Sequence, residues 1–234
     1  MPDANQIGAD PNKSCRFFDP YKGDFYGTGQ SILSKKMLIV GASHYCQYFY
    51  ECGNKCGTIA KDQDCSDFTW SVFDTYFSSQ ERKHWMATYT AFANSVFGYD
   101  ASFEDRCKFY QSVVFANYLQ RTEGKNGNEK HDSWFRNPQN AAAFKQTIAE
   151  YVPEVVVIWG VRVWRALPWR DFTFDEAQST DNVKKCNCQG KSFILMHVHH
   201  PSLGYDREAY FALFQENGIF VIDPSNKQER GNRS

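Results

Sequence analysis

Four short apolar runs alternate with longer mixed segments along the chain. They cover residues 37–40, 113–116, 155–159 and 193–198 and consist largely of valine, isoleucine, leucine, phenylalanine and methionine. Short continuous apolar runs are typical of strands that are buried on both faces of a parallel sheet. The sequence therefore predicts four core strands, and the β-branched run at 155–159, stopped by Gly160, gives the strongest signal.

Helical patterns lie between and after these runs. The first predicted helix has an apolar stripe at Trp85, Tyr89, Phe92 and Val96. Ser78 and Glu81 have the spacing of a capping box before it, and Gly98 stands where a helix ends. Asn137 and Pro138 predict the start of another helix, and residues 162–167 and 203–217 predict two more.

Strands that alternate with helices predict an α/β fold with a parallel sheet covered on both faces. We expect a three-layer αβα sandwich with a central four-stranded, mainly parallel sheet, formed by one domain over residues 35–220. The polar, turn-rich residues 1–34 predict an irregular N-terminal arm, and residues 221–234 predict a C-terminal tail.

Composition adds limits to this picture. With 234 residues, 42% hydrophobic and 23% charged, the chain has the make-up of a globular protein. Its longest strongly apolar run, at 155–161, is far shorter than the ~20 residues that a membrane span needs, and no secretory signal is evident. We expect a cytoplasmic monomer with reduced thiols and no membrane association. The net charge of −1 gives no basic surplus for holding nucleic acid, so any basic patch must be local.

Ligands of parallel α/β sheets bind beyond the carboxyl ends of the strands. The residues that directly follow the predicted strands are therefore the first candidates for a site. They are Gly41-Ala42-Ser43-His44-Tyr45, Asn117-Tyr118, Gly160 and His200-Pro201-Ser202.

These strand ends, in this order, resemble the uracil-DNA glycosylase superfamily. The segments are LIVGASHY at 38–45, VVFANY at 113–118, VVVIWG at 155–160 and HHPS at 199–202. The resemblance spans residues 37 to about 216 and implies a central parallel sheet between helices. It also implies a DNA partner, single- or double-stranded, in which the N-glycosidic bond of a flipped uracil or related base is hydrolysed.

The resemblance assigns roles to several residues. His200 would donate a hydrogen bond to the pyrimidine O2, where negative charge develops as the bond breaks. Asn117 would read the edge of the base, and Phe68, in the segment DFTW, would stack on it. Pro201 and Ser202 would hold a backbone phosphate beside the flipped nucleotide.

The first loop departs from the family pattern. Active members place Asp, Asn or Glu one or two residues after the glycine, whereas this chain has Ala42 and Ser43 after Gly41. Ser43 could orient water but supplies no negative charge. His44 stands where the family often has proline, and Tyr45 matches a tyrosine that excludes the methyl group of thymine. A catalytically weak or inactive member that binds nucleic acid or a nucleobase is therefore the first alternative.

The cysteines leave a second question open. Cys46, Cys52, Cys56 and Cys65 lie within twenty residues and could close a structural zinc site, although their spacing does not match an iron–sulfur cluster of the family. We expect free thiols and no cofactor. His197 and His199 alternate on the last strand, where packed histidines are expected rather than a metal-ligand pair.

A serine esterase is the rival from another class of enzyme. Gly41-Ala42-Ser43 fits the G-x-S turn in which some esterases carry the nucleophile, and His200 could be its base. The orienting acid of such enzymes often lies three residues before the histidine, where this chain has His197.

Overall fold

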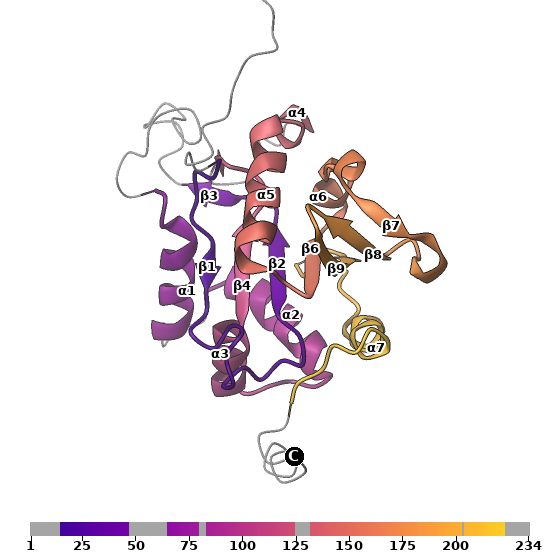
Figure 1. Cartoon of the computed structure of the whole chain (residues 1–234). Coiled ribbons are helices and arrows are strands. Elements are labelled where there is room, and N and C mark those ends of the chain that lie inside the picture. The colour runs from indigo at the N-terminus through magenta and orange to yellow at the C-terminus, as the bar shows by residue number, and fades with distance from the viewer. Residues whose placement is uncertain (1–14, 47–64, 80–82, 125–131, 203, 223–234) are drawn as a thin grey trace, which may run out of the picture.

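A seven-stranded sheet forms the centre of the computed structural model, which describes residues 15–46, 65–79, 83–124, 132–202 and 204–222. The strand order is β1-β4-β2-β6-β9-β8-β7 (Figure 1). The four middle strands run parallel to one another: β4 (Val113–Asn117), β2 (Met37–Gly41), β6 (Val155–Trp159) and β9 (Lys191–Val198). They are the strands that the apolar runs predict, so the expectation of an α/β fold with a mainly parallel sheet is confirmed.

The expected number of strands is wrong, because short antiparallel strands extend the sheet on both sides. β1 (Tyr21–Lys22) pairs with β4, while β8 (Val183–Cys188) pairs with β9 and β7 (Thr173–Asp175) pairs with β8. β8 carries Lys184 and Lys185 and so lacks the continuous apolar run of a strand covered on both faces. A separate two-stranded ladder joins β3 (His44–Cys46) and β5 (Thr122–Gly124) in parallel.

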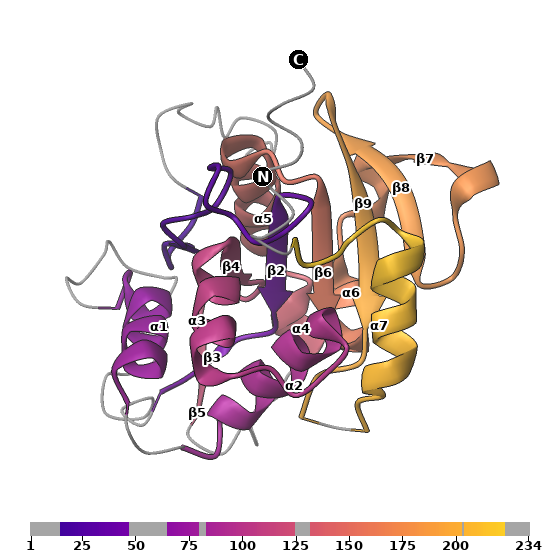
Figure 2. The same ribbon diagram turned by 90° about the horizontal axis from the view of Figure 1, so that it is seen from below.

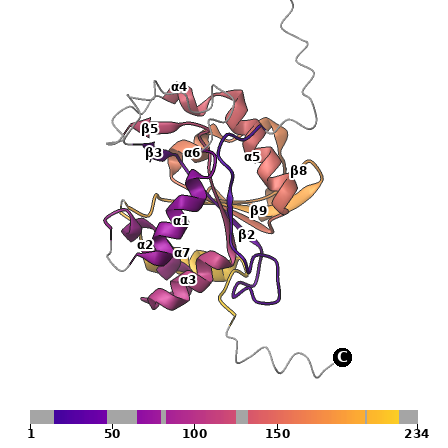
Figure 3. The ribbon, with the colours of Figure 1, turned by 90° about the vertical axis from the view of Figure 1, so that its left-hand side faces the viewer.

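Helices cover both faces of the sheet (Figures 2 and 3). One face packs against α1 (Phe68–Ser78), α2 (Met86–Phe97), α3 (Phe103–Gln111) and α7 (Arg207–Glu216). The other packs against α4 (Asp132–Phe135), α5 (Pro138–Tyr151) and α6 (Val161–Ala166). Two short 3-10 turns, η1 (Trp169–Asp171) and η2 (Glu176–Gln178), flank β7. Met37 and Ile39 of β2 point to the first core, and Leu38 and Val40 to the second, as the alternation of a strand requires.

Local sequence determines where several helices begin and end. Asn137 caps α5, since its side chain accepts a hydrogen bond from the Gln139 N–H at 2.9 Å. Gly98 ends α2 with a left-handed backbone, φ 81°. The predicted capping box is wrong, because Ser78 is the last residue of α1 and its hydroxyl donates to the carbonyl of Asp74 at 2.7 Å. Its other member, Glu81, lies outside the described residues.

The described part of the N-terminal arm is attached to the domain. Besides β1, the N–H groups of Phe17 and Phe18 donate to the side-chain oxygen of Gln120 at 2.8 and 3.3 Å. Leu33 forms an antiparallel bridge with Val221. The contacts with Gln120 bring the start of the described arm beside the segment that follows β4, whereas the bridge holds its end beside the residues after α7.

Candidate functional site

A cavity of about 620 Å3 lies where the carboxyl ends of the parallel strands meet. Its volume is in the range of small-molecule sites, which are about 300–1,000 Å3. Its walls come from β2, β3, β4, β6, α1, α2 and the segment after β9. They comprise Gly41, Ala42, Ser43, His44, Tyr45, Phe68, Ser71, Val72, Thr75, Lys83, Trp85, Thr88, Tyr89, Phe115, Asn117, Trp159 and His200.

The structure brings most of the predicted site residues to this cavity. The members that line it are Gly41, Ala42, Ser43, His44, Tyr45, Phe68, Asn117 and His200. Pro201 and Ser202 follow His200 in the chain but do not line the cavity; Pro201 is buried and Ser202 is exposed. Segments as far apart in the chain as Gly41 and His200 thus line one cavity, as expected for parallel strands whose ends lie together.

The side chain of Asn117 packs over the last residue of β2. A Cβ on Gly41 would lie 2.4 Å from Asn117 Oδ1, so any residue larger than glycine would displace this amide. Backbone pairing continues past the strands, because the N–H groups of Tyr118 and Leu119 donate to the carbonyls of Gly41 and Ala42, both at 2.9 Å. The Asn117 side chain has no hydrogen-bond partner among the described residues, which leaves its donor and acceptor available to a ligand.

His200 is held by the residue two positions after it. Its Nδ1 lies 2.7 Å from Ser202 Oγ and 3.4 Å from the Ser202 backbone nitrogen. Because a backbone N–H only donates, Nδ1 acts as the acceptor, and the neutral ring carries its proton on Nε2. His200 therefore has the tautomer required of a hydrogen-bond donor through Nε2.

Tyr45 and Ser43 bring polar groups of the first loop to the cavity. The Tyr45 ring is 50% exposed, and burial of its phenol, with the Glu123 carboxylate, raises its pKa, while Arg162 and the nearby Ser43 hydroxyl oppose the rise. Ser43 Oγ is buried and makes no hydrogen bond to a described residue, so it lies near the phenol without hydrogen-bond geometry. A neutral Tyr45 thus offers an aromatic surface at the cavity.

The His44 side chain holds this loop against the N-terminal arm and α1. Its ring packs against Phe18 and Phe68, with centroids 4.8 and 4.6 Å away, and its Nε2 lies 3.0 Å from Thr69 Oγ1. Burial lowers the pKa of His44 to about 3, so the ring is neutral at physiological pH. His44 consequently brings no positive charge to the cavity.

Aromatic side chains make up much of the remaining wall. Phe68, the expected stacking residue, is partly buried against His44. The sequence pattern places Trp85 and Tyr89 only on the apolar stripe of a helix and Phe115 only in a buried strand. In the structure all three line the cavity. An apolar stripe predicts which face of a helix is buried, but it does not predict which residues of that face line a cavity.

Trp159, the last residue of β6, is the other functional candidate that sequence reasoning misses. It belongs to the strand itself, whereas the residue directly after the strand is Gly160. Trp159 is 3% exposed, and its ring centroid lies 5.6 Å from Tyr89 and 6.1 Å from His200. Its Nε1 is buried without a hydrogen-bond partner among the described residues, which leaves an unsatisfied donor in the cavity wall.

The charge of the lining is simple. Among the described lining residues, Lys83 is the one lysine or arginine, and none is an aspartate or glutamate. No described lining residue therefore supplies the carboxylate that the sequence lacks at Ala42 and Ser43. Hydrogen bonds and aromatic contacts are what the wall offers to a ligand.

The predicted cysteine cluster falls largely on undescribed residues. Cys52 and Cys56 lie outside the described residues, whereas Cys46 and Cys65 are partly buried at the two borders of that segment. Over the described part of the chain, no three His, Cys, Asp or Glu side chains are grouped as metal ligands. The zinc site stays the alternative to the free thiols that the sequence favours.

The two residues of the alternative esterase site line the same cavity but are not joined. No hydrogen bond links Ser43 to His200 within the described chain, and the Nδ1 that an orienting acid would hold is bound to Ser202. His197 stacks on Trp164, with centroids 5.3 Å apart, and its Nδ1 lies 3.3 Å from Asn182 Oδ1. His197 is thus engaged on the α6 side of the sheet.

In the part of the chain that the structure describes, no helix has the length and apolar character needed to cross a membrane. A scan against protein-family models finds no match, and neither does a search of the curated proteins. The geometry of the cavity at the strand ends is therefore the basis on which a function is assigned.

Proposed function

We propose that the chain is a uracil-DNA glycosylase-like protein that hydrolyses the N-glycosidic bond of uracil, or a related base, flipped out of single- or double-stranded DNA. One observation carries the proposal. A cavity of small-molecule size, at the carboxyl ends of the parallel strands, brings together Asn117, His200, Tyr45 and Phe68 from four separate segments. These are the residues to which the resemblance in sequence assigns recognition and catalysis.

The chemistry fits the side chains that meet there. The Asn117 amide offers one donor group and one acceptor, which complements the O4 and N3–H of uracil. Phe68 and Tyr45 offer aromatic surfaces for a base removed from its stack. The low charge of the wall suits a neutral base better than a phosphate.

His200 would act on the leaving base. When the bond between C1′ and N1 breaks, its electron pair stays with the base and spreads onto O2. The Nε2–H of His200 would stabilise that oxygen by a hydrogen bond. Water adds to C1′, and the proton that it loses neutralises the departing base. Ser43 is the lining residue that we assign to positioning this water.

A slow or inactive binder of the same ligand is the second candidate. The absence of Asp and Glu from the described lining favours it, since no carboxylate there can polarise water or balance the positive sugar. Both candidates require the same cavity to hold a flipped base, and they differ only in turnover.

A labelled oligonucleotide with one uracil, single-stranded and in a U·G duplex, tests the proposal after alkaline cleavage. We expect cleavage that His200→Ala abolishes and that His199→Ala, at the exposed neighbouring histidine outside the lining, retains. Uracil-dependent retention of the oligonucleotide without cleavage would select the binder. If neither occurs, the proposal is wrong, and release of p-nitrophenol from acyl esters, lost in Ser43→Ala, becomes the test for an esterase.

A further inference from the structure

A second cavity, of about 460 Å3, lies between the C-terminal end of α1, α2 and α3. Its walls comprise Tyr76, Phe77, Ser78, Ser79, Met86, Thr90, Phe103 and Arg106. None of these residues lines the cavity at the strand ends, so whatever binds here binds at a separate place.

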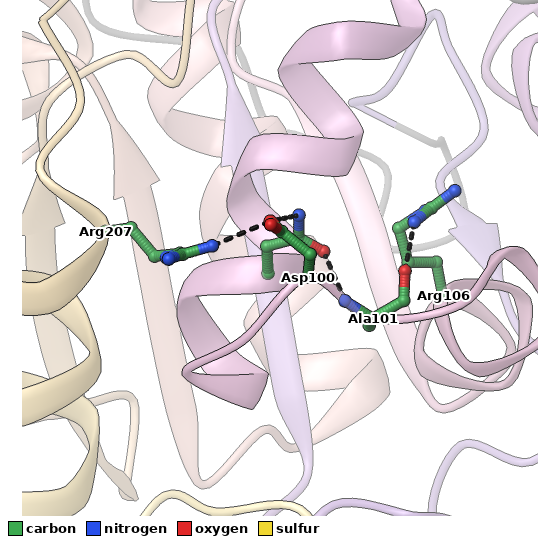
Figure 4. A network of polar contacts seen from close by, with 5 residues as sticks. Asp100, Ala101, Arg106 and Arg207 are labelled. Carbon is green, nitrogen blue, oxygen red and sulfur yellow. Dashed lines mark hydrogen bonds and ion pairs between the residues drawn. The ribbon is translucent and has the colours of Figure 1, made fainter.

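Arg106 is the unusual member of this wall. It is only 5% exposed, and it donates from Nη1 to the backbone carbonyl of Ala101 (Figure 4). Its Nε is buried and has no hydrogen-bond partner among the described residues. α3 therefore holds a cationic guanidinium away from bulk water.

The nearby carboxylates are engaged elsewhere. Glu104 pairs with Lys108 at 2.8 Å, and Asp105 accepts a hydrogen bond from Ser102 at 2.7 Å. Asp100 accepts from Arg207 at 2.7 Å, on the other side of Ala101 (Figure 4). Within the described residues, no carboxylate lies within 4.0 Å of the Arg106 guanidinium, and a buried charge without a counter-ion is costly.

Tyr76 adds a second unsatisfied group to the same wall. Its side chain is 2% exposed, and its hydroxyl has no hydrogen bond of good geometry to any described residue. Burial raises the pKa of the phenol, although Thr90 and Arg106 lie close enough to oppose the rise. The hydroxyl is therefore protonated and able to donate.

We propose that this cavity binds a phosphate-type oxyanion, held by the guanidinium of Arg106 and the hydroxyls of Tyr76 and Thr90. A guanidinium presents its N–H groups in a planar fork that matches two oxygens of a phosphate. The anion would neutralise the buried charge. Both unpaired donors have almost no accessible surface, so binding would turn the Arg106 and Tyr76 side chains toward the anion and satisfy them. The proposal does not depend on the glycosylase assignment, because the two cavities have no lining residue in common.

The test compares anions at equal ionic strength. The full-length protein is titrated with inorganic phosphate by calorimetry, and its Tm is followed in phosphate and in chloride. A short oligonucleotide with a 5′-phosphate is compared with its unphosphorylated twin, which distinguishes a free ion from a strand end as the source of the phosphate group. Saturable binding that chloride does not reproduce is expected in at least one of these arms.

Two variants assign the binding to this cavity. Tyr76→Phe removes one donor and leaves the ring, and we expect about tenfold weaker phosphate binding with an unliganded Tm that is unchanged or higher. Arg106→Lys keeps the charge, loses the fork and should weaken binding at least as much. Tyr99→Phe, at an exposed tyrosine outside this cavity, is the control and should bind like the wild type. The proposal is overturned if neither arm shows phosphate-dependent binding, or if binding is equal in Tyr76→Phe, Arg106→Lys and the wild type.

Discussion

Asn117 Oδ1 occupies the space that a side chain at position 41 would need. The last residues of β4 and β2 are register partners in the sheet, and a Cβ on Gly41 would lie only 2.4 Å from that oxygen. The glycine that begins the loop and the asparagine proposed to read the base are therefore one structural unit.

Gly41→Ala should affect stability and activity together. The new methyl group would push the Asn117 side chain out of place, at a cost of about 1–3 kcal/mol in the free energy of unfolding, and base excision should fall. Gly29→Ala is the matched control, because nothing lies within 4 Å of a Cβ there. Denaturant unfolding and the uracil assay check both effects. If Gly41→Ala behaves like Gly29→Ala, the close approach has no consequence.

Asn117→Asp should shift the preference of the site from uracil toward cytosine. The carboxylate only accepts hydrogen bonds, so it complements the amino group of cytosine in place of the carbonyl O4 of uracil. Excision from matched oligonucleotides containing uracil or cytosine measures the ratio, with circular dichroism as the check on folding. An unchanged ratio in a folded variant would remove Asn117 from base recognition.

Ser202→Ala should release the Nδ1 of His200. Losing a hydrogen bond of 2.7 Å from an exposed serine costs about 1 kcal/mol, so excision should slow by about fivefold to tenfold. NMR of the ring nitrogens separates this effect from a general loss of structure, since the fraction of the Nε2–H tautomer should fall. A variant with the same tautomer and a slower reaction would show that Ser202 acts in another way, such as phosphate binding.

His44 should make stability depend on pH in the acidic range. Its pKa is about 3 in the folded protein and near 6.5 when exposed, so the unfolded chain binds the extra proton between these values. Stability from this group is complete above pH 6.5 and decreases as the pH falls, by up to about 1.4 kcal/mol per pH unit. His44→Asn should flatten the curve of unfolding free energy between pH 6.5 and 4. The exposed His84→Asn is the control, and equal slopes in both variants would contradict the assignment.

Ser43→Asp or Ala42→Glu should raise excision if the missing carboxylate limits the rate. Either change puts a negative charge into a wall whose described lining has none, where it could polarise water. The single-turnover rate of uracil release is the measurement. No gain in either folded variant would mean that the loop positions water differently from active members of the family.

The parallel core was predictable because its strands are continuous apolar runs, and the site followed because their ends share one edge. The flanking strand β8 was missed because lysines interrupt its apolar pattern. Its backbone hydrogen bonds to the antiparallel strand β9, which the pattern does not reveal, hold it in the sheet. α3, with Ser102 as its cap, was missed because the segment Phe103–Gln111 is mostly polar and so lacks the large apolar stripe that marks α2. Trp159 and Tyr89 show the limit for the site, since burial of a side chain does not indicate whether it borders a cavity.

The short strands at the two ends of the sheet also affect how the protein meets other copies of itself. β1 contributes two residues and β7 three, so each end offers few unpaired backbone groups to a foreign strand. β1 pairs with Phe115 and Val114 of β4, which belong to one of the most apolar strands. Removing Tyr21–Lys22 would turn that strand into an open edge and would also take the buried Tyr21 ring from the core, so aggregation through added β-strands would then be expected.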